Sequence, residues 1–446
     1  MAMSTAVLVL GFVIFQVALV TRCWALFLVG AGISGFGFGV ILILSVAVAL
    51  KWSPDLRGTV TGGCILGFGV GKELCRLYSN SIVETTESQL DQVFWIMFFI
   101  NAPIAIFSIV VARTPPNDFQ INGQNMHCIP VNKAPNDEFV QDEYLHIGMT
   151  LVNYKAIERR SDSLIEGTDC HYYEQVKALT LPQCILSTDF LCIFLALFSN
   201  GLVGLYYEQI TAAKYPKSSL EEIYNLSKDK IDTVRYHGIV SDLTGRLFMP
   251  VLSDFFIRLL YANPAVVRKN FFTFVLLLQF ITLTVAHFGS DNLSNFTYVE
   301  WLLNLLQFAS NSGAALVVCL LTDMFGVYHI GTMNGLSSMT WVFGEIVLII
   351  MPMKTVSDIA NQVRLFWYIS LVCLLIMFFV RTNSMDRFYC GYQFTLCGKV
   401  IIQRPTSRGV TRTMDIYFDG HSANHRASMP YLCASDSLGS LDDSTS

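Results

Sequence analysis

Charged residues are scarce in this chain of 446 residues. Asp, Glu, Lys and Arg make up 14% of it, where a soluble domain has roughly a quarter. The formal net charge is -5, and no basic stripe is present that could neutralise nucleic-acid phosphates. The composition therefore argues against a soluble enzyme and excludes a nucleic-acid partner.

The motifs of metal, redox and nucleotide chemistry are missing as well. The 12 Cys are scattered, several of them in apolar runs, and no C-x-x-C occurs, so we interpret them as small buried hydrophobic residues. No His/Cys set has metal-ligand spacing, and no Ser–His–Asp arrangement stands out. The stretch Gly67–Lys72 superficially resembles a phosphate-binding loop, but Leu66 occupies its first glycine position and Glu73 follows the lysine. The sequence predicts no enzyme, no metal and no cofactor.

Long hydrophobic runs are what the chain has in abundance: 53% of its residues are hydrophobic and its mean hydropathy is +0.49. Spanning a bilayer takes about 20 residues of helix, and a lone segment in lipid must satisfy its own backbone hydrogen bonds. The sequence thus predicts an all-α polytopic membrane protein with about ten transmembrane helices. The predicted segments are Ser4–Val20, Trp24–Leu50, Thr59–Leu77, Val93–Val111, Leu186–Tyr206, Arg235–Ile257, Phe271–His287, Trp301–Thr322, Gly331–Pro352 and Leu365–Val380.

The segments group as four plus six. We expect a helical bundle in 1–112, a mostly disordered cytoplasmic loop in 113–180, a six-helix bundle in 181–383 and a mostly disordered tail in 384–446. The first residues are apolar and lack a basic region, so a cleavable signal peptide is not expected.

Charge predicts the orientation in the membrane. One side of the predicted bundle carries Lys or Arg in loops 51–57 and 257–270 and in the tail after 380. The positive-inside rule predicts that this side is cytoplasmic. Loops 78–92 and 289–300 on the other side carry acids, while 208–234 is mixed. The three N-x-[ST] sequons, at Asn225, Asn292 and Asn295, lie on that outer side. The protein is predicted to be multi-pass, in the plasma membrane or an endomembrane, with its oligomeric state open.

Four short motifs in a fixed order resemble major facilitator transporters. They are Lys51-Trp-Ser-Pro-Asp-Leu-Arg-Gly58 followed by Gly67–Gly71, Gly245-Arg-Leu-Phe248 with Ser253-Asp254 and Arg258, Asp323-Met-Phe-Gly326, and Leu179–Phe190. They most resemble the nodulin-like, oxalate–formate antiporter and monocarboxylate transporter branch. The resemblance implies the major facilitator fold, with two bundles around a central cavity.

In that alignment the first segment corresponds to the family's third helix. The first two helices and the first-half copy of the Gly–Asp–Arg element are then missing, which we attribute to a truncated gene model or splice form. A natural ten-helix chain is the alternative.

Asp242 and Arg246 are the sharpest candidates for mechanism. Both lie near the middle of a predicted span, and four-residue spacing places them on one helix face. Buried charges in a membrane usually face a cavity or one another. Arg246 could bind a carboxylate and Asp242 a proton, as the similar pair in proton-linked monocarboxylate transporters implies. The alternative is an ion pair that only fixes helix packing.

Lys72 and Glu345 are further candidates for substrate or proton coupling. Lys72 lies late in its segment, beside Glu73 and Arg76, which can pair at i, i+3. The alternative for this group is a local ion pair whose arginine reaches the surface. Glu345 is a lone acid in its segment and either couples transport or reaches outer water.

The family resemblance implies a conformational latch formed by Gly245, Ser253, Asp254 and Arg258 at the cytoplasmic end of their helix. The alternative is a capped, solvated loop. Dense glycines at 30–39 and 62–71 indicate close helix packing.

The sequence predicts a secondary transporter that moves a small organic anion by alternating access, as symporter or antiporter. A monocarboxylate with proton coupling is the first hypothesis, and the lipid bilayer is the other partner. The alternative is a non-transporting membrane sensor, regulatory or truncated transporter-like protein. A receptor with a signalling tail fits the four-plus-six grouping poorly.

Overall fold

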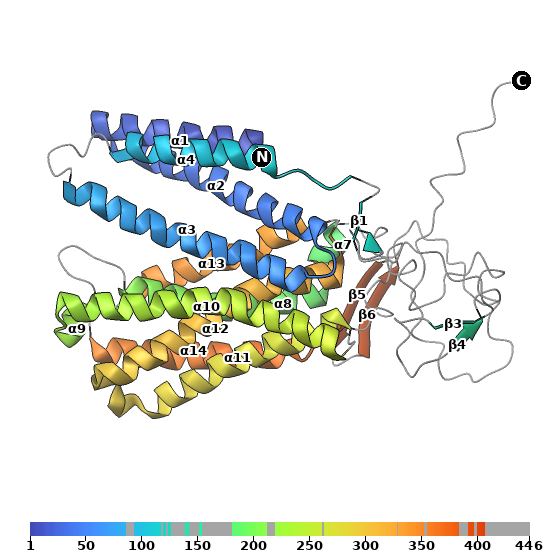
Figure 1. Ribbon diagram of the computed structural model, residues 1–446. Helices are drawn as coiled ribbons and strands as arrows, with labels where there is room; N and C mark the ends of the chain where they lie inside the picture. Colours follow the sequence, from blue (N-terminus) through green and yellow to red (C-terminus); the bar gives the residue numbers. More distant parts are fainter. Residues whose placement is uncertain are drawn as a thin grey trace, which may run out of the picture.

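Ten long helices dominate the part of the chain that the structure, a computed structural model, describes (Figure 1). The described residues are 1–85, 93–116, 119–121, 124–125, 139–141, 151–153, 181–211, 219–260, 263–327, 329–351, 355–382, 391–396 and 399–405. Most of the loop predicted at 113–180 and of the tail predicted at 384–446 lies outside them. Short antiparallel strand pairs are described within both segments: β1 (Gln120–Ile121) with β2 (Gln124–Asn125), β3 (Phe139–Gln141) with β4 (Leu151–Asn153), and β5 (Gly391–Leu396) with β6 (Lys399–Pro405).

The first four helices form the N-terminal bundle. They are α1 (Ala2–Thr21), α2 (Trp24–Trp52), α3 (Arg57–Thr85) and α4 (Val93–Val111). Helix α1 packs against α2 and α4. Glycines set these contacts: a Cβ on Gly37 would lie 2.7 Å from the backbone nitrogen of Leu8, and one on Gly11 would lie 2.6 Å from Cβ of Ser34. The glycine-rich segment thus allows close packing of α1 on α2, as predicted.

The second bundle is the larger one. It consists of α8 (Thr188–Thr211), α10 (Lys228–Leu260), α11 (Pro264–Phe288), α12 (Phe296–Phe325), α13 (Ile330–Ile350) and α14 (Val356–Met377), with the short helices α7 (Leu181–Ile185) and α9 (Ser219–Tyr224) and the 3-10 turn η2 (Ser290–Ser294). Local caps begin several of these helices: the side chain of Asn263 accepts from the backbone of Ala265, and Thr355 and Asp358 form a capping box.

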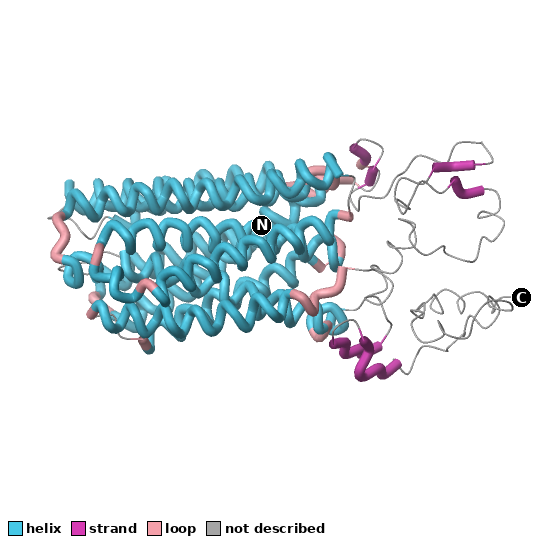
Figure 2. The backbone as a smooth tube through the Cα atoms, turned by 90° about the horizontal axis from the view of Figure 1, so that it is seen from below, coloured by secondary structure: helices cyan, strands magenta, loops and turns pink. Residues whose placement is uncertain are grey.

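Seven of the described helices are long and apolar enough to cross a membrane: α1, α2, α8, α11, α12, α13 and α14. Helices α3 and α10 run alongside them but contain ionisable residues, and α4 is apolar over most of its 19 residues. The chain is therefore a multi-pass membrane protein. The helices run along one common direction, and the strands gather beyond one end (Figure 2). We call this end the α7 end, and the opposite end the α9 end.

Several predicted boundaries were wrong, because the helices extend beyond their apolar segments; two of them bear on the site. The predicted loop 257–270 is almost entirely helical, because α10 extends to Leu260 and α11 begins at Pro264. Glu208, placed in a loop, lies in α8, which continues to Thr211. Hydropathy marks the apolar part of a helix, whereas backbone hydrogen bonds continue into its polar ends.

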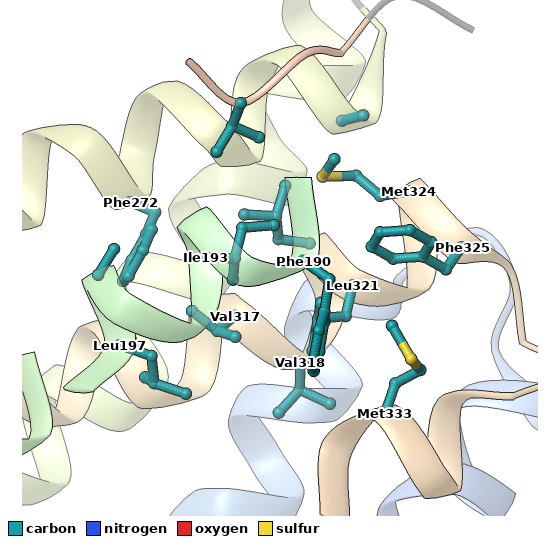
Figure 3. Packing of buried hydrophobic residues seen from close by; sticks show 14 of the residues in the cluster. Phe190, Ile193, Leu197, Phe272, Val317, Val318, Leu321, Met324, Phe325 and Met333 are labelled. Atoms are coloured by element: carbon teal, nitrogen blue, oxygen red, sulfur yellow. The ribbon is translucent and has the colours of Figure 1, made fainter. Parts of the chain in front are cut away.

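One hydrophobic cluster lies at the α7 end, where it contains Cys184 of α7, and it includes side chains of both bundles. Figure 3 shows some of its side chains from the second bundle. Phe190, Phe272 and Phe325 of the second bundle belong to it, together with Val46 and Leu50 of α2. A second cluster toward the α9 end contains side chains from 198 to 369 only. Among the described residues, the apolar seal between the bundles is therefore at the α7 end.

Candidate functional site

Asp242 and Arg246 form the buried ion pair that their spacing predicts. Nε of Arg246 donates to Oδ1 of Asp242 at 2.7 Å, and Nη2 donates to Oδ2 at 3.1 Å. The side chains are 4% and 7% exposed, respectively. Two parallel bonds to one carboxylate give this contact both its strength and its orientation.

The same arginine also contacts the other bundle. Nη1 of Arg246 donates to the carbonyl oxygen of Ile65 at 3.3 Å, and the guanidinium carbon lies 5.6 Å from the ring centroid of Phe68. Helix α3 can come this close because residue 69 is glycine: a Cβ there would lie 3.0 Å from Nε of Arg246. The pair therefore lies on the seam where α3 packs against α10.

Asp254 anchors the start of α3. Its carboxylate accepts from the backbone nitrogens of Gly58, at 3.0 Å, and Thr59, at 2.6 Å, and from the hydroxyl of Thr59 at 2.9 Å. The first backbone N–H groups of a helix lack partners within the helix and attract anions. A side chain of the C-terminal bundle therefore caps a helix of the N-terminal bundle.

A buried charge network surrounds this anchor. Nη2 of Arg268 donates to Asp254 at 2.7 Å, its Nη1 donates to Asp323, and Nη1 of Arg57 donates to Asp323 at 3.1 Å. The four side chains are at most 8% exposed. Two arginines and two aspartates from α3, α10, α11 and α12 thus balance in charge and join both bundles.

The four residues predicted to form a latch do not all belong to the charge network. Of the four, Asp254 is in the network, whereas Arg258 is 56% exposed and donates to Asp55 at 3.3 Å. The hydroxyl of Ser253 donates to the carbonyl oxygen of Pro250 at 2.7 Å. Gly245 allows close packing, since a Cβ there would lie 2.6 Å from the carbonyl oxygen of Phe308 on α12.

Sequence reasoning missed Arg57, Arg268 and Asp323 as members of one site. Arg57 and Asp323 were noted only within motifs, and Arg268 was counted only as a loop charge. The available signal was that each lies within a few residues of a helix end on the same side of the membrane. Three helices must be placed before that signal identifies a network.

Lys72 also bridges the bundles, closer to the α9 end. Its ammonium donates to Glu208 on α8, and the two side chains are 37% and 41% exposed. The neighbouring Arg76 donates to Glu73 at 2.8 Å, which is the local pair that the i, i+3 spacing allows. Glu345 is exposed on α13 and lies close enough to Glu208 for their charges to repel.

Helix α3 has glycines on two of its faces. Gly58, Gly62 and Gly69 face α10: a Cβ on Gly58 would lie 2.5 Å from both Oδ1 of Asp254 and the carbonyl oxygen of Pro250. A Cβ on Gly63, Gly67 or Gly71 would meet no described atom within 4 Å. Close packing of this helix therefore takes place on one of its glycine faces.

Metal and thiol chemistry find little support in the described part of the chain. No group of three or more His, Cys, Asp or Glu side chains there could hold a metal ion. Burial raises the pKa of the Cys184 thiol to about 11, so this cysteine stays a neutral thiol at physiological pH.

Comparison with known proteins identifies the type of fold. No family model matches the sequence, and no curated protein is significantly similar to it. Among solved structures, the human organic anion transporter MFSD10 (TETRAN) aligns with a TM-score of 0.52 at 13% identity, covering 84% of this chain and 75% of that one.

Two further alignments have lower scores. A variant of the E. coli fucose:proton symporter FucP gives a TM-score of 0.46 at 14% identity, covering 84% of this chain and 80% of that one. A bacterial homologue of the iron transporter ferroportin in an outward-facing state gives 0.46 at 13%, covering 84% and 82%.

The protein therefore has a fold of the major facilitator type, which is a fold of secondary transporters. The predicted fold class is confirmed. At this identity the likeness shows the fold alone.

Proposed function

We propose that this protein is a secondary transporter of a small organic anion, working by alternating access with proton coupling at Asp242 and Arg246. The observation that carries the proposal is that Arg246 is bound to Asp242 through two hydrogen bonds while it also contacts Ile65 and Phe68 of the opposite bundle. Arg246 is a buried cation that contacts both bundles, so binding of an anion to it can be coupled to the movement of one bundle relative to the other.

The coupling follows from competition for one guanidinium group. While Asp242 is ionised, it occupies the donors of Arg246. Protonation of Asp242 removes its negative charge and weakens both hydrogen bonds, which frees Arg246 for the carboxylate of a substrate. Release of the proton on the other side restores the pair and expels the anion. A monocarboxylate is the substrate class that matches one arginine with two donors facing one carboxylate.

Alternating access also needs a contact that holds one state closed. We assign this role to Asp254 with Arg57, Arg268 and Asp323, since this network joins the bundles at the α7 end. Opening there requires the α3 N-terminus to leave Asp254. Arg258, on the rim, contributes less because its charge is exposed. In the orientation predicted from Lys and Arg, this end is cytoplasmic.

The test is uptake of radiolabelled lactate, as a representative monocarboxylate, into proteoliposomes with and without an inward proton gradient. We expect wild-type uptake to rise with the gradient. Asp242→Asn should abolish that dependence, because the asparagine cannot be protonated. The matched control is Asp229→Asn, an exposed aspartate in the first turn of the same helix, which should leave coupling intact. Equal proton dependence in Asp242→Asn and wild type would refute the assignment.

A non-transporting regulatory protein is the second candidate. The open glycine face of α3 favours it, because Gly63, Gly67 and Gly71 meet no described neighbour and small residues usually mark helix contacts in membranes. Absence of uptake across a panel of monocarboxylates by a folded, reconstituted protein would favour this candidate.

A further inference from the structure

Glu208 is an ionisable group that neither the sequence motifs nor the proposed coupling pair uses. It lies in the last turn of α8, where it accepts a hydrogen bond from the ammonium group of Lys72 on α3. The two residues belong to different bundles. In the proposed mechanism, these bundles are the parts that move relative to one another.

The position of this contact along the helices is distinct from that of the buried network. Lys72 lies fifteen residues after Arg57 on α3, which at 1.5 Å per residue is about 22 Å along the helix axis. Asp254 and its partners close the α7 end, so the Lys72–Glu208 contact lies on the α9 side.

The surroundings of the two contacts also differ. At the α7 end, Val46 and Leu50 of α2 join the hydrophobic cluster of the C-terminal bundle. The cluster toward the α9 end contains no residue before 198 among those described. Among the described residues on that side, Lys72–Glu208 is the ion pair that joins the bundles.

Exposure makes this contact reversible. The side chains of Lys72 and Glu208 are 37% and 41% exposed, whereas Arg268 and Asp254 are both 4% exposed. An exposed ion pair is screened by water and salt and can break and re-form readily. A buried pair resists breaking, because each separated charge stays desolvated.

Glu345 lies on α13 of the same bundle as Glu208 and is exposed. The two carboxylates repel one another, and the positive charge of Lys72 offsets this repulsion.

We propose that Glu208 is a gating residue: through its ion pair with Lys72 it holds the two bundles together at the α9 end. This role rests on the proposed alternating-access function. Glu208 is a positioning residue, because it acts through Lys72 and not by binding substrate.

The experiment measures distances between the bundles in nanodiscs by pulsed electron paramagnetic resonance. Labels are attached to p-acetylphenylalanine, because the chain has 12 Cys. One label pair, at Leu77 of α3 and Tyr236 of α10, reports the α9 end. A second pair, at Val111 of α4 and Leu259 of α10, reports the α7 end. All four side chains are exposed.

We expect Glu208→Gln to lengthen the mean Leu77–Tyr236 distance and to leave the Val111–Leu259 distance unchanged. Glu208→Lys should lengthen it further, since Lys72 then faces a like charge. The reciprocal variant Lys72→Glu with Glu208→Lys should restore the wild-type distance. Restoration separates an ion pair from a merely structural role, which a charge exchange would not rescue.

Asp254→Asn serves as the reference for the other end. A change at Val111–Leu259 in this variant, with no change at Leu77–Tyr236 in either Glu208 variant, would overturn the gate and leave the transporter proposal standing. Failure of the exchanged pair to restore the distance would also overturn the gate. If no variant moved either distance, both the gate and alternating access would be refuted.

Discussion

Two helices of the C-terminal bundle, α12 and α8, are enclosed by their neighbours to a degree that α1 and α2 of the N-terminal bundle are not. Of the most apolar stretch of α12, 83% is buried, and of α8, 72%; the corresponding values for α1 and α2 are 28% and 17%. Helix α12 packs against α8, α10 and α11 at once. The C-terminal bundle thus encloses two helices in a core of its own, whereas α3 of the N-terminal bundle packs more against α10 than against α2 or α4.

The nature of the contacts differs as well. Within the C-terminal bundle, buried polar side chains bond directly: Nδ2 of Asn200 donates to Gln279 at 3.0 Å and to the carbonyl oxygen of Ala309 at 3.2 Å. Between the bundles, the described contacts include the apolar seal at the α7 end, but the polar ones are the α3–α10 seam, the charge network and the exposed Lys72–Glu208 and Arg258–Asp55 pairs. Interactions that must break and re-form are therefore concentrated at the boundary.

The largest expected effect comes from removing the centre of the charge network. Arg268→Met leaves the buried carboxylates of Asp254 and Asp323 without their shared partner. Breaking a buried pair in this way costs about 3–5 kcal/mol. We expect the free energy of unfolding in nanodiscs, measured by steric trapping, to fall by that amount. Arg258→Met is the matched control, and its 56% exposed side chain should give a much smaller loss. Equal losses would contradict the network.

The next effect tests the two glycine faces of α3. Gly58→Val inserts a side chain where a Cβ would lie 2.5 Å from Asp254 and from the backbone of Pro250, so the seam must separate. Overpacking of this kind costs about 1–3 kcal/mol. Gly67→Val, on the face without described neighbours, should cost far less in the same steric-trapping assay. A reversed order of the two variants would mean that the N-terminal bundle does not depend on the α10 seam.

The smallest expected effect on stability comes from testing the orientation in the membrane, which is the same for both bundles. Asn225 directly follows α9, and Asn292 lies in η2, where the carbonyl oxygen of Leu293 accepts from the hydroxyl of Tyr224 in α9. The charge pattern predicts that the α9 end is exposed to the secretory lumen. Expression in mammalian cells should give a band that shifts on deglycosylation. The combined variant Asn225→Gln, Asn292→Gln and Thr297→Ala should abolish the shift, because Thr297→Ala removes the third sequon, at Asn295. Stability should be nearly unchanged, because all three substituted side chains are exposed. As a control, Gln124→Thr creates a sequon at residue 122 that should remain unmodified; a glycan there would invert the topology.

The sequence predicted the helices well and the interfaces poorly. All ten apolar segments correspond to helices, because a run of about 20 apolar residues is a strong local signal. The pair of Asp242 and Arg246 was also local, since four-residue spacing is enough to bring the groups together. The partner of Lys72 was not, because Glu208 follows it by 136 positions and was placed in a loop. The anchoring of α3 by Asp254 depends on backbone groups, which no side-chain pattern reveals.

The seam on α3 has a consequence for biosynthesis. A ribosome makes the N-terminal bundle first, yet the surface that stabilises it, the face of α10 opposite Gly58, Gly62 and Gly69, is made more than 150 residues later. At about 5–20 residues per second, α1–α4 wait on the order of ten seconds in the membrane for their partner. During this interval their small-residue face is open to other helices. The native protein should therefore depend on the membrane insertion machinery to shield that face, and variants that slow synthesis between the two bundles should be degraded more than their stability alone would predict.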